Sequence, residues 1–256
     1  MTRAPANVVL LAAGRGSRIA ALAGETHKSL LPVGGRSSLE RALDEAVART
    51  AGQVVVVTGD RRESIERFVR DRYGSRVDTV HNERFAEDMN ILSTELGVSA
   101  LRRPEDGYLV VETDVVVGPG GWDAVYAPEA SGASYWVTRG RYGRALTGGA
   151  LDADAAGNVT GLVYAPVWSE RYEGWQKLLG ILFVGPGQAA RDRAIRREAL
   201  ARTTAQYYMT PWVENLAELP CRARPLGEAF AGSFNDPESY LAVDRRLREA
   251  EAGVLR

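Results

Sequence analysis

The chain has 256 residues, of which 45% are hydrophobic and 25% charged, the composition of a globular protein that can bury a large core. Lys and Arg number 32 against 33 Asp and Glu, and the formal net charge of −1 argues against a general nucleic-acid binder, for which a basic excess is usual. Cys221 is the single cysteine, so an internal disulfide is excluded and a small structural role is expected.

The sequence shows no targeting or membrane segment. Met1–Asn7 is too short and too polar for a signal peptide, and no apolar run reaches the roughly 20 residues of a membrane span. We therefore expect a cytoplasmic protein with neither nucleic acid nor membrane as a partner. The sequence leaves the oligomeric state open, and a homodimer is compatible with it.

The first half alternates between apolar runs and helical patterns. Continuous apolar runs are typical of strands buried on both faces. The sequence predicts strands at 7–12, 53–58, 76–80 and 108–112, and helices at 37–51, 63–73 and 91–101. Asn90 is expected to cap the last of these helices. The alternation predicts an α/β fold with a Rossmann-like, mostly parallel sheet and helices on both faces.

The second half is more mixed. Alternating or short apolar runs predict strands at 133–138, 145–151, 158–164 and 180–184. Charged segments with helical spacing predict helices at 188–202, 205–219 and 236–250. Because no repeat or low-complexity linker divides the chain, we expect one domain over 1–256.

A Gly-rich loop follows the first predicted strand. Its sequence is Leu11-Ala12-Ala13-Gly14-Arg15-Gly16-Ser17-Arg18. Ligands of open α/β sheets bind at the carboxyl ends of strands, and small residues there let backbone N–H groups approach phosphate oxygens. The two arginines add positive charge. A dinucleotide loop would have Gly where Ile19 stands, and no Gly-Lys-Ser/Thr of a P-loop is present. The loop therefore predicts a site for a phosphate chain.

A lysine lies about ten residues beyond this loop, where it can fold back over the phosphates. The segment reads His27-Lys28-Ser29-Leu30-Leu31-Pro32-Val33. Together the two motifs resemble those of the MobA-like nucleotidyltransferases that make nucleotide-sugars and CDP-alcohols. The resemblance implies a GT-A-like architecture, an NTP on the loop backbone, and Arg18 and Lys28 as the catalytic groups that hold its phosphates. His27 replaces the usual proline; it either contacts a phosphate or is a loop residue without a chemical role.

The same resemblance implies a Mg²⁺ cofactor. Asp114, just past the strand at 108–112, matches the family's metal ligand, and Glu112 replaces the first Asp of the usual Asp-x-Asp. Near the C-terminus, Asn235 takes the position of the second ligand by register, with Asp236 adjacent. Mg²⁺ is typically held by one or two carboxylates plus substrate phosphates. The alternative is that Asn235 or Asp236 only caps the final helix, with Pro237 in its first turn.

The segment Val80–Ser93 resembles the part of bacterial choline-phosphate cytidylyltransferases that ends in Asn-x-x-Ser and lines the pocket of the base and ribose. Asn90 and Ser93 take those two positions. This resemblance implies CTP as the nucleotide, with residues 1–115 forming the nucleotide-binding half and 116–256 the acceptor-binding half.

Two interpretations of the acceptor pocket remain. Arg139 and Arg141 lie in a basic segment that also contains Arg144. The three guanidinium groups can bind a phosphonate or carboxylate through paired hydrogen bonds. Lys177 and Tyr207 are candidates for the same pocket. Alternatively, aromatic faces hold a choline group by cation–π attraction. The aromatic candidates are Trp136, Trp168, Trp175, Trp212, Tyr207 and Tyr208.

We therefore expect a metal-dependent cytidylyltransferase that moves CMP from CTP to a small phosphonate or phosphate and releases pyrophosphate. Such an acceptor is ionised at neutral pH, so no general base is needed. The alternatives are a sugar-1-phosphate nucleotidyltransferase that uses UTP, dTTP or GTP, and a nucleotide-sensing module without catalysis.

Overall fold

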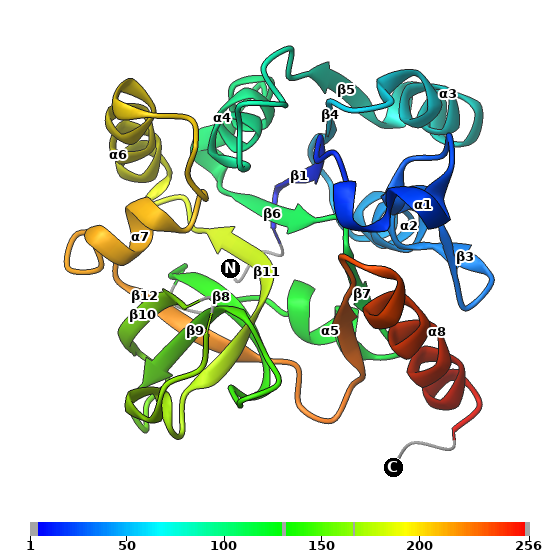
Figure 1. Cartoon of the computed structure of the whole chain (residues 1–256). Coiled ribbons are helices and arrows are strands. Elements are labelled where there is room, and N and C mark those ends of the chain that lie inside the picture. The colour runs from blue at the N-terminus through cyan, green and yellow to red at the C-terminus, as the bar shows by residue number, and fades with distance from the viewer. Residues whose placement is uncertain (1–4, 130–131, 166, 254–256) are drawn as a thin grey trace.

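A central β-sheet runs through the part of the chain that the computed structural model describes, residues 5–129, 132–165 and 167–253 (Figure 1). Residues 1–4, on which part of the expectation about a signal peptide rests, lie outside this description. The sheet has nine strands within the described residues. Its core order is β6-β1-β4-β5, all parallel, with bounds β1 Asn7–Ala12, β4 Val54–Thr58, β5 Asp78–His81 and β6 Tyr108–Glu112.

Both faces of this parallel core are covered by helices, as the sequence predicts. Alternate side chains of β1 enter opposite clusters, with Val8 and Leu10 on one face and Val9 and Leu11 on the other. The first cluster includes residues of α2 (Ser38–Arg49), α3 (Arg62–Tyr73) and α5 (Gly121–Tyr126). The second includes residues of α4 (Ile91–Ser99), α6 (Ala189–Arg202) and α7 (Thr210–Glu214). The predicted α/β class is therefore confirmed.

The second half extends the sheet with mainly antiparallel strands. β11 (Gln176–Val184) pairs with β6, and β9 (Gly148–Ala153) and β10 (Val159–Ala165) follow outward. β8 (Ser134–Arg141) also pairs with β11 and carries β12 (Cys221–Pro225) on its other edge. The predicted strand at 180–184 begins earlier, at Gln176, so Lys177 lies inside a strand rather than before one.

The helix predicted over 205–219 is wrong in extent. The chain leaves α6 with Thr203 extended, and α7 begins only at Thr210 with Pro211 in its first turn. Proline is favoured at a helix start and disfavoured in its interior, which explains this boundary. Tyr207 and Tyr208 therefore lie in the connecting segment before α7.

Short elements carry the C-terminal segment to the parallel core. β7 (Val115–Val117) comes directly after β6 in the chain, and β13 (Ala231–Ser233) pairs with it in the antiparallel sense. α8 (Pro237–Glu251) follows β13. Phe234, Val243 and Leu247 pack with Ile19 and Val33 in a separate hydrophobic cluster. In Figure 1, α8 lies beside β7. The remaining short elements are η1 Ser17–Ile19, α1 Ala20–Ala23, η2 Lys28–Leu30, β2 Pro32–Val33, β3 Arg36–Ser37, η3 Gly74–Arg76, η4 Pro104–Asp106 and η5 Glu170–Tyr172.

A buried polar network fastens α6 and α7 to the sheet. The Asp192 carboxylate accepts hydrogen bonds from Tyr108 Oη, from Arg196 and, at 2.8 Å, from Trp212 Nε1. Arg196 Nε also donates to Glu95 Oε2 at 2.9 Å. Partners of this kind offset the free-energy cost of burying charged groups.

Among the described residues, every helix is too short or too polar to span a lipid bilayer.

Candidate functional site

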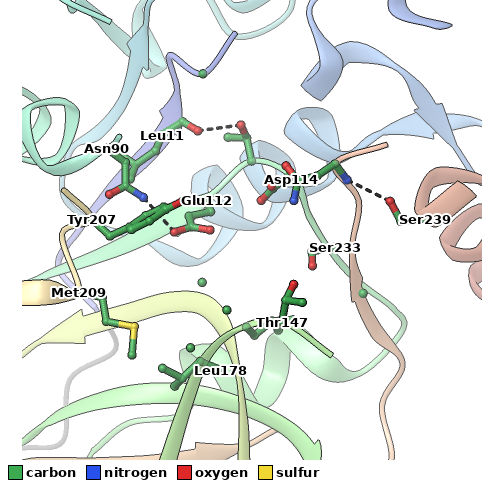
Figure 2. A pocket seen from close by; sticks show the side chains of 18 of the residues that line it. Leu11, Asn90, Glu112, Asp114, Thr147, Leu178, Tyr207, Met209, Ser233 and Ser239 are labelled. Carbon is green, nitrogen blue, oxygen red and sulfur yellow. Dashed lines mark hydrogen bonds between the residues drawn. The ribbon is translucent and has the colours of Figure 1, made fainter. Parts of the chain in front are cut away.

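A cavity of about 960 Å³ opens beyond the carboxyl ends of β1 and β6 (Figure 2). Figure 2 shows Leu11, Glu112 and Asp114 along one wall, with Thr147 and Leu178 across the space from them. This is the edge at which open α/β sheets bind ligands. Most of the predicted site residues line the cavity. They are Leu11, Ala13, Gly14, Arg18, Lys28, Asn90, Ser93, Asp114, Arg139, Lys177, Tyr207, Asn235 and Asp236.

Part of the Gly-rich loop lies outside this lining. Ala12, Arg15, Gly16 and Ser17 are not among the lining residues. Gly16 has a φ of 58°, and a Cβ there would stand 3.2 to 3.3 Å from carbons of the Lys28 side chain. A glycine at this position therefore tolerates the left-handed backbone and lets the lysine stem pass close to the loop.

His27 joins the loop to the lysine segment. It is 1% exposed, and its Nε2 lies 2.9 Å from the Gly14 carbonyl oxygen while Nδ1 lies 2.7 Å from Ser29 Oγ. A carbonyl only accepts, so Nε2 carries the proton and Nδ1 accepts from the Ser29 hydroxyl. Burial lowers the pKa of His27 to about 4. The sequence left its role open; in the structure it is a neutral bridge that positions the loop.

Lys28 connects three segments that are far apart in the sequence. Its Nζ donates to Asp114 Oδ2 at 3.1 Å and to Asn235 Oδ1 at 3.0 Å. The pairing of β7 with β13 brings the segments of Asp114 and Asn235 together, and the Phe234 N–H donates to the Asp114 carbonyl at 3.2 Å. The Lys28 ammonium group, a carboxylate oxygen and an amide oxygen thus meet at one point of the cavity.

Asp236 has a different place from Asn235. It is the N-cap of α8, its side chain accepts from the Ser239 N–H at 2.8 Å, and the Ser239 hydroxyl completes a capping box. Hydrogen bonds from Ser239 lower the pKa of Asp236. The capping interpretation therefore applies to Asp236, while the amide oxygen of Asn235 is directed at Lys28 and lies with Asp114.

The donors at this point suit a hard divalent cation. Asp114 and Asn235 supply a carboxylate and an amide oxygen within 3.1 Å of the same ammonium nitrogen. Among the described residues, no group of three or more His, Cys, Asp or Glu side chains is arranged as a metal site. A small number of protein oxygens fits Mg²⁺, which usually takes the rest of its ligands from water and substrate phosphates.

Glu112 is a half-buried carboxylate in the same wall. Burial, and then the charge of Asp114, raise the pKa of Glu112 to about 8. Asn90 Nδ2 donates to Glu112 Oε1 at 3.2 Å, and a Cβ at Gly180 would stand 2.7 Å from Glu112 Oε2. The glycine at position 180 of β11 therefore leaves the room that the Glu112 carboxyl group needs. The sequence showed it only as a departure from Asp-x-Asp.

The two residues expected near the base are held by protein partners. The expected side-chain cap by Asn90 is wrong, because its amide bonds Glu112 and accepts the Tyr208 N–H at 2.8 Å instead. Ser93 Oγ donates to Asp88 Oδ2 at 2.7 Å and accepts from Asn82 Nδ2 at 2.9 Å. Both residues line the cavity, and both fix the wall that they belong to.

The opposite wall is cationic. Lys177 is 9% exposed, and burial, followed by the charge of Arg139, lowers its pKa to about 8. Its Nζ donates to the carbonyl oxygens of Gly149 and Leu178 at 3.2 and 2.7 Å. Arg141, expected with Arg139, is exposed and is not among the lining residues. In a regular strand these two residues would share a face, but Gly140 between them has a φ of 54°, outside the strand region, so the alternation does not hold here.

The aromatic candidates are mostly used in packing. The Trp136 ring stacks on Tyr208 at 5.6 Å and meets Trp212 edge-on at 6.0 Å within the second core cluster. Trp168 and Trp175 pack against a small cluster away from the cavity lining. Tyr207 stacks on Tyr164 at 4.3 Å, and these two rings line the cavity together with Trp136 and Tyr208.

Comparison with known proteins identifies a family for this chain. The family described as MobA-like NTP transferase domain matches residues 8–205. The choline-phosphate cytidylyltransferase of Haemophilus influenzae is 34% identical over 111 residues, 43% of this chain and 45% of that protein. CMP-5'-(3-aminopropyl)phosphonate synthase of Streptomyces rubellomurinus is 32% identical over 161 residues, 62% of this chain and 24% of that protein. The matches thus span less than half the length of each relative.

A solved structure extends the likeness to nearly the whole chain. The CTP:phosphocholine cytidylyltransferase from Streptococcus pneumoniae superposes with a TM-score of 0.78, covering 95% of this chain and 99% of that one. Its sequence identity is 17%, so the comparison establishes a shared fold.

The buried His27 predicts a pH dependence of stability. Because its folded-state pKa of about 4 lies below the ordinary 6.5, the unfolded chain takes up the proton more readily, and stability is lost as the pH falls from 6.5 to 4. This loss amounts to at most about 3 kcal/mol. The charged groups near the ring are Lys28, Asp60 and Arg61.

Urea unfolding of wild type and His27→Gln between pH about 7.5 and about 4.5 measures this loss. The stability advantage of the wild type should shrink steadily as the pH falls, because glutamine does not titrate. Parallel curves for the two proteins would show that His27 is protonated in the folded state as easily as in the unfolded chain.

Proposed function

The chain belongs to the family of MobA-like NTP transferase domains, and from that membership we propose that it is a cytidylyltransferase that moves CMP from CTP to a small phosphonate or phosphate. The observation that carries the proposal is that Lys28, Asp114 and Asn235 meet in the cavity that the Gly-rich loop also lines. A cation and two oxygen donors beside a phosphate-binding loop suit phosphoryl chemistry better than mere nucleotide sensing.

The reaction is a single in-line displacement. An ionised oxygen of the acceptor attacks the α-phosphorus of CTP, a new P–O bond forms, and the bond from the α-phosphorus to the bridging oxygen breaks. Pyrophosphate leaves with that electron pair. The acceptor brings its own negative oxygen, so the neutral His27 and the other side chains of the cavity have no proton to remove.

The protein contributes position and charge. Lys28 and Arg18 neutralise the charge on the α-phosphate and on the leaving pyrophosphate, and the loop backbone at Gly14 approaches the phosphate chain. Asp114 and Asn235 would hold Mg²⁺, which supplies charge neutralisation of the phosphate oxygens when bound. Lys28, which bonds these same two oxygens, would then face the nucleotide phosphates instead.

The preference for CTP is supported by the similar proteins, two of which are named for cytidylyl transfer. The preference for an anionic acceptor is supported by the wall formed by Lys177 and Arg139, since guanidinium and ammonium groups bind phosphonate oxygens. Trp168, Trp175 and Trp212 are not among the residues that line the cavity, which argues against a choline cage built from these three; Trp136 lines the cavity, stacked on Tyr208.

Pyrophosphate release tests the proposal. The purified chain is assayed with Mg²⁺ and each of CTP, UTP, dTTP and GTP, against phosphocholine, aminoalkyl phosphonates and hexose 1-phosphates. We expect the highest kcat/KM with CTP and a phosphonate, and no turnover in EDTA. A preference for UTP, dTTP or GTP with a hexose 1-phosphate would replace the proposal by the sugar-nucleotide alternative. Nucleotide binding without any turnover would favour the sensor.

Lys28→Ala removes the cation expected at the α-phosphate. Loss of one such charge-stabilising donor should lower kcat about 10²- to 10³-fold. The matched control is Arg67→Ala, which removes an exposed charge on α3, remote from the cavity lining. A Lys28→Ala rate within about threefold of wild type would mean that Lys28 has no catalytic role.

The two adjacent C-terminal candidates should behave differently. Asn235→Ala should raise the Mg²⁺ concentration needed for half-maximal activity on the order of tenfold or more, because it removes an oxygen donor beside Asp114. Asp236→Ala should instead lower the free energy of unfolding by about 1 kcal/mol through loss of the α8 cap. Mg²⁺ titration of activity and urea unfolding of both variants distinguish them. The assignment fails when Asp236→Ala shifts the Mg²⁺ requirement and Asn235→Ala does not.

A further inference from the structure

Two arginines from distant parts of the chain stand where two cavities adjoin. Arg139 lies on β8 and Arg246 on α8, and both line the large cavity. Both also line a second cavity of about 380 Å³, together with Glu228, Phe230 and other residues of the 227–231 segment. The two cavities therefore adjoin at these two guanidinium groups.

These guanidinium groups are not matched by carboxylates. Among the ion pairs formed by described residues, none includes Arg139 or Arg246; Glu228, in the wall of the second cavity, is not in an ion pair either. Arg139 Nη1 donates to the Ala231 carbonyl at 2.8 Å, whereas its Nε is buried without a hydrogen-bond partner. The Arg246 guanidinium lies over the Phe230 ring at 5.5 Å.

The two charges also act on each other. Burial and the charge of Arg246 lower the pKa of Arg139. Arg246 is exposed and Arg139 is half-buried, so an anion bound between the two guanidinium groups would relieve their mutual repulsion. A carboxylate can accept parallel hydrogen bonds from a guanidinium, so it would match the charge of this pair.

Lys177 links this pair to the site of transfer. Arg139 on one side, and Glu112 and Asp114 on the other, all act electrostatically on the Lys177 ammonium. Cationic groups thus extend from Lys28, beside Asp114, through Lys177 to Arg139 and Arg246. An acceptor with its reacting oxygen near Asp114 would point its far end toward the two arginines.

We propose that the acceptor carries a second anionic group, a carboxylate, joined to its phosphonate by a short chain, and that Arg139 and Arg246 bind this group. The proposal rests on the proposed cytidylyl transfer and names the substrate class of that site. An acceptor that ends in an ammonium group would meet repulsion at the same place, and one with an apolar end would leave the arginines unmatched.

Three acceptors of similar length separate these cases. They are 2-carboxyethylphosphonate, 2-aminoethylphosphonate and propylphosphonate, each assayed for pyrophosphate release with CTP and Mg²⁺. The wild type should use the carboxylate compound with a kcat/KM at least about tenfold above the other two, the gain expected from one charge-assisted hydrogen-bonded pair. Equal use of all three, or a preference for the amine, would overturn the proposal while leaving cytidylyl transfer intact.

Arg246→Gln assigns the preference to this residue. It should reduce the ratio of kcat/KM for the carboxylate compound over propylphosphonate about tenfold or more, chiefly through KM. The matched control is Arg245→Gln, which removes the neighbouring exposed charge of α8, outside both cavities, and should leave the ratio at the wild-type value. An unchanged ratio in Arg246→Gln contradicts the proposal.

Calorimetric binding of 2-carboxyethylphosphonate to the protein without nucleotide gives a readout independent of turnover. Binding should be present in wild type and Arg245→Gln and weakened in Arg246→Gln. Absence of binding to wild type, or equal binding to all three proteins, overturns the anion site. Absence of turnover with every acceptor and nucleotide, with this binding pattern retained, would instead reject the proposed function alone.

Discussion

The parallel pairing of β1 with β6 determines where the rest of the site can lie. Its register places Leu11 opposite Glu112, so the Gly-rich loop and the turn that carries Asp114 leave the sheet side by side. Thr113 strengthens this edge, since its Oγ1 donates to the Leu11 carbonyl at 2.8 Å and its own carbonyl accepts from Ser38 Oγ at 2.6 Å. A backbone fixed in this way can present phosphate-binding N–H groups and a carboxylate to the same ligand.

Many polar side chains of the cavity are occupied with one another. His27 holds the loop at Gly14, Asn90 ties Glu112 to the Tyr208 backbone, and Ser93 is bound by Asp88 and Asn82. These contacts fix rotamers before any ligand arrives, which is the preorganisation that charge stabilisation requires. Lys28 differs, because its two partners are also the oxygen donors proposed for the metal.

Apart from Lys28, which pairs with Asp114, most of the charges discussed above fall into two groups in the cavity. Carboxyl groups lie at the edge of the parallel strands, at Glu112 and Asp114, and cations lie on β11, β8 and α8, at Lys177, Arg139 and Arg246. The proposed divalent ion and nucleotide phosphates belong near the first group. The acceptor, with its negative groups, belongs along the second.

The sequence by itself determined the parallel core, the Gly-rich loop, and Lys28 and Asp114 as residues of one site. These features are local: apolar runs predict buried strands, and a strand end predicts the ligand edge. Only the tertiary structure separated Asn235 from Asp236, because the pairing of β13 with β7 aims one at Lys28 while the helix start uses the other. It likewise placed Arg141 outside the cavity and brought in Arg246 from α8, since the position of a side chain across a sheet or helix boundary depends on long-range packing that residue patterns do not encode.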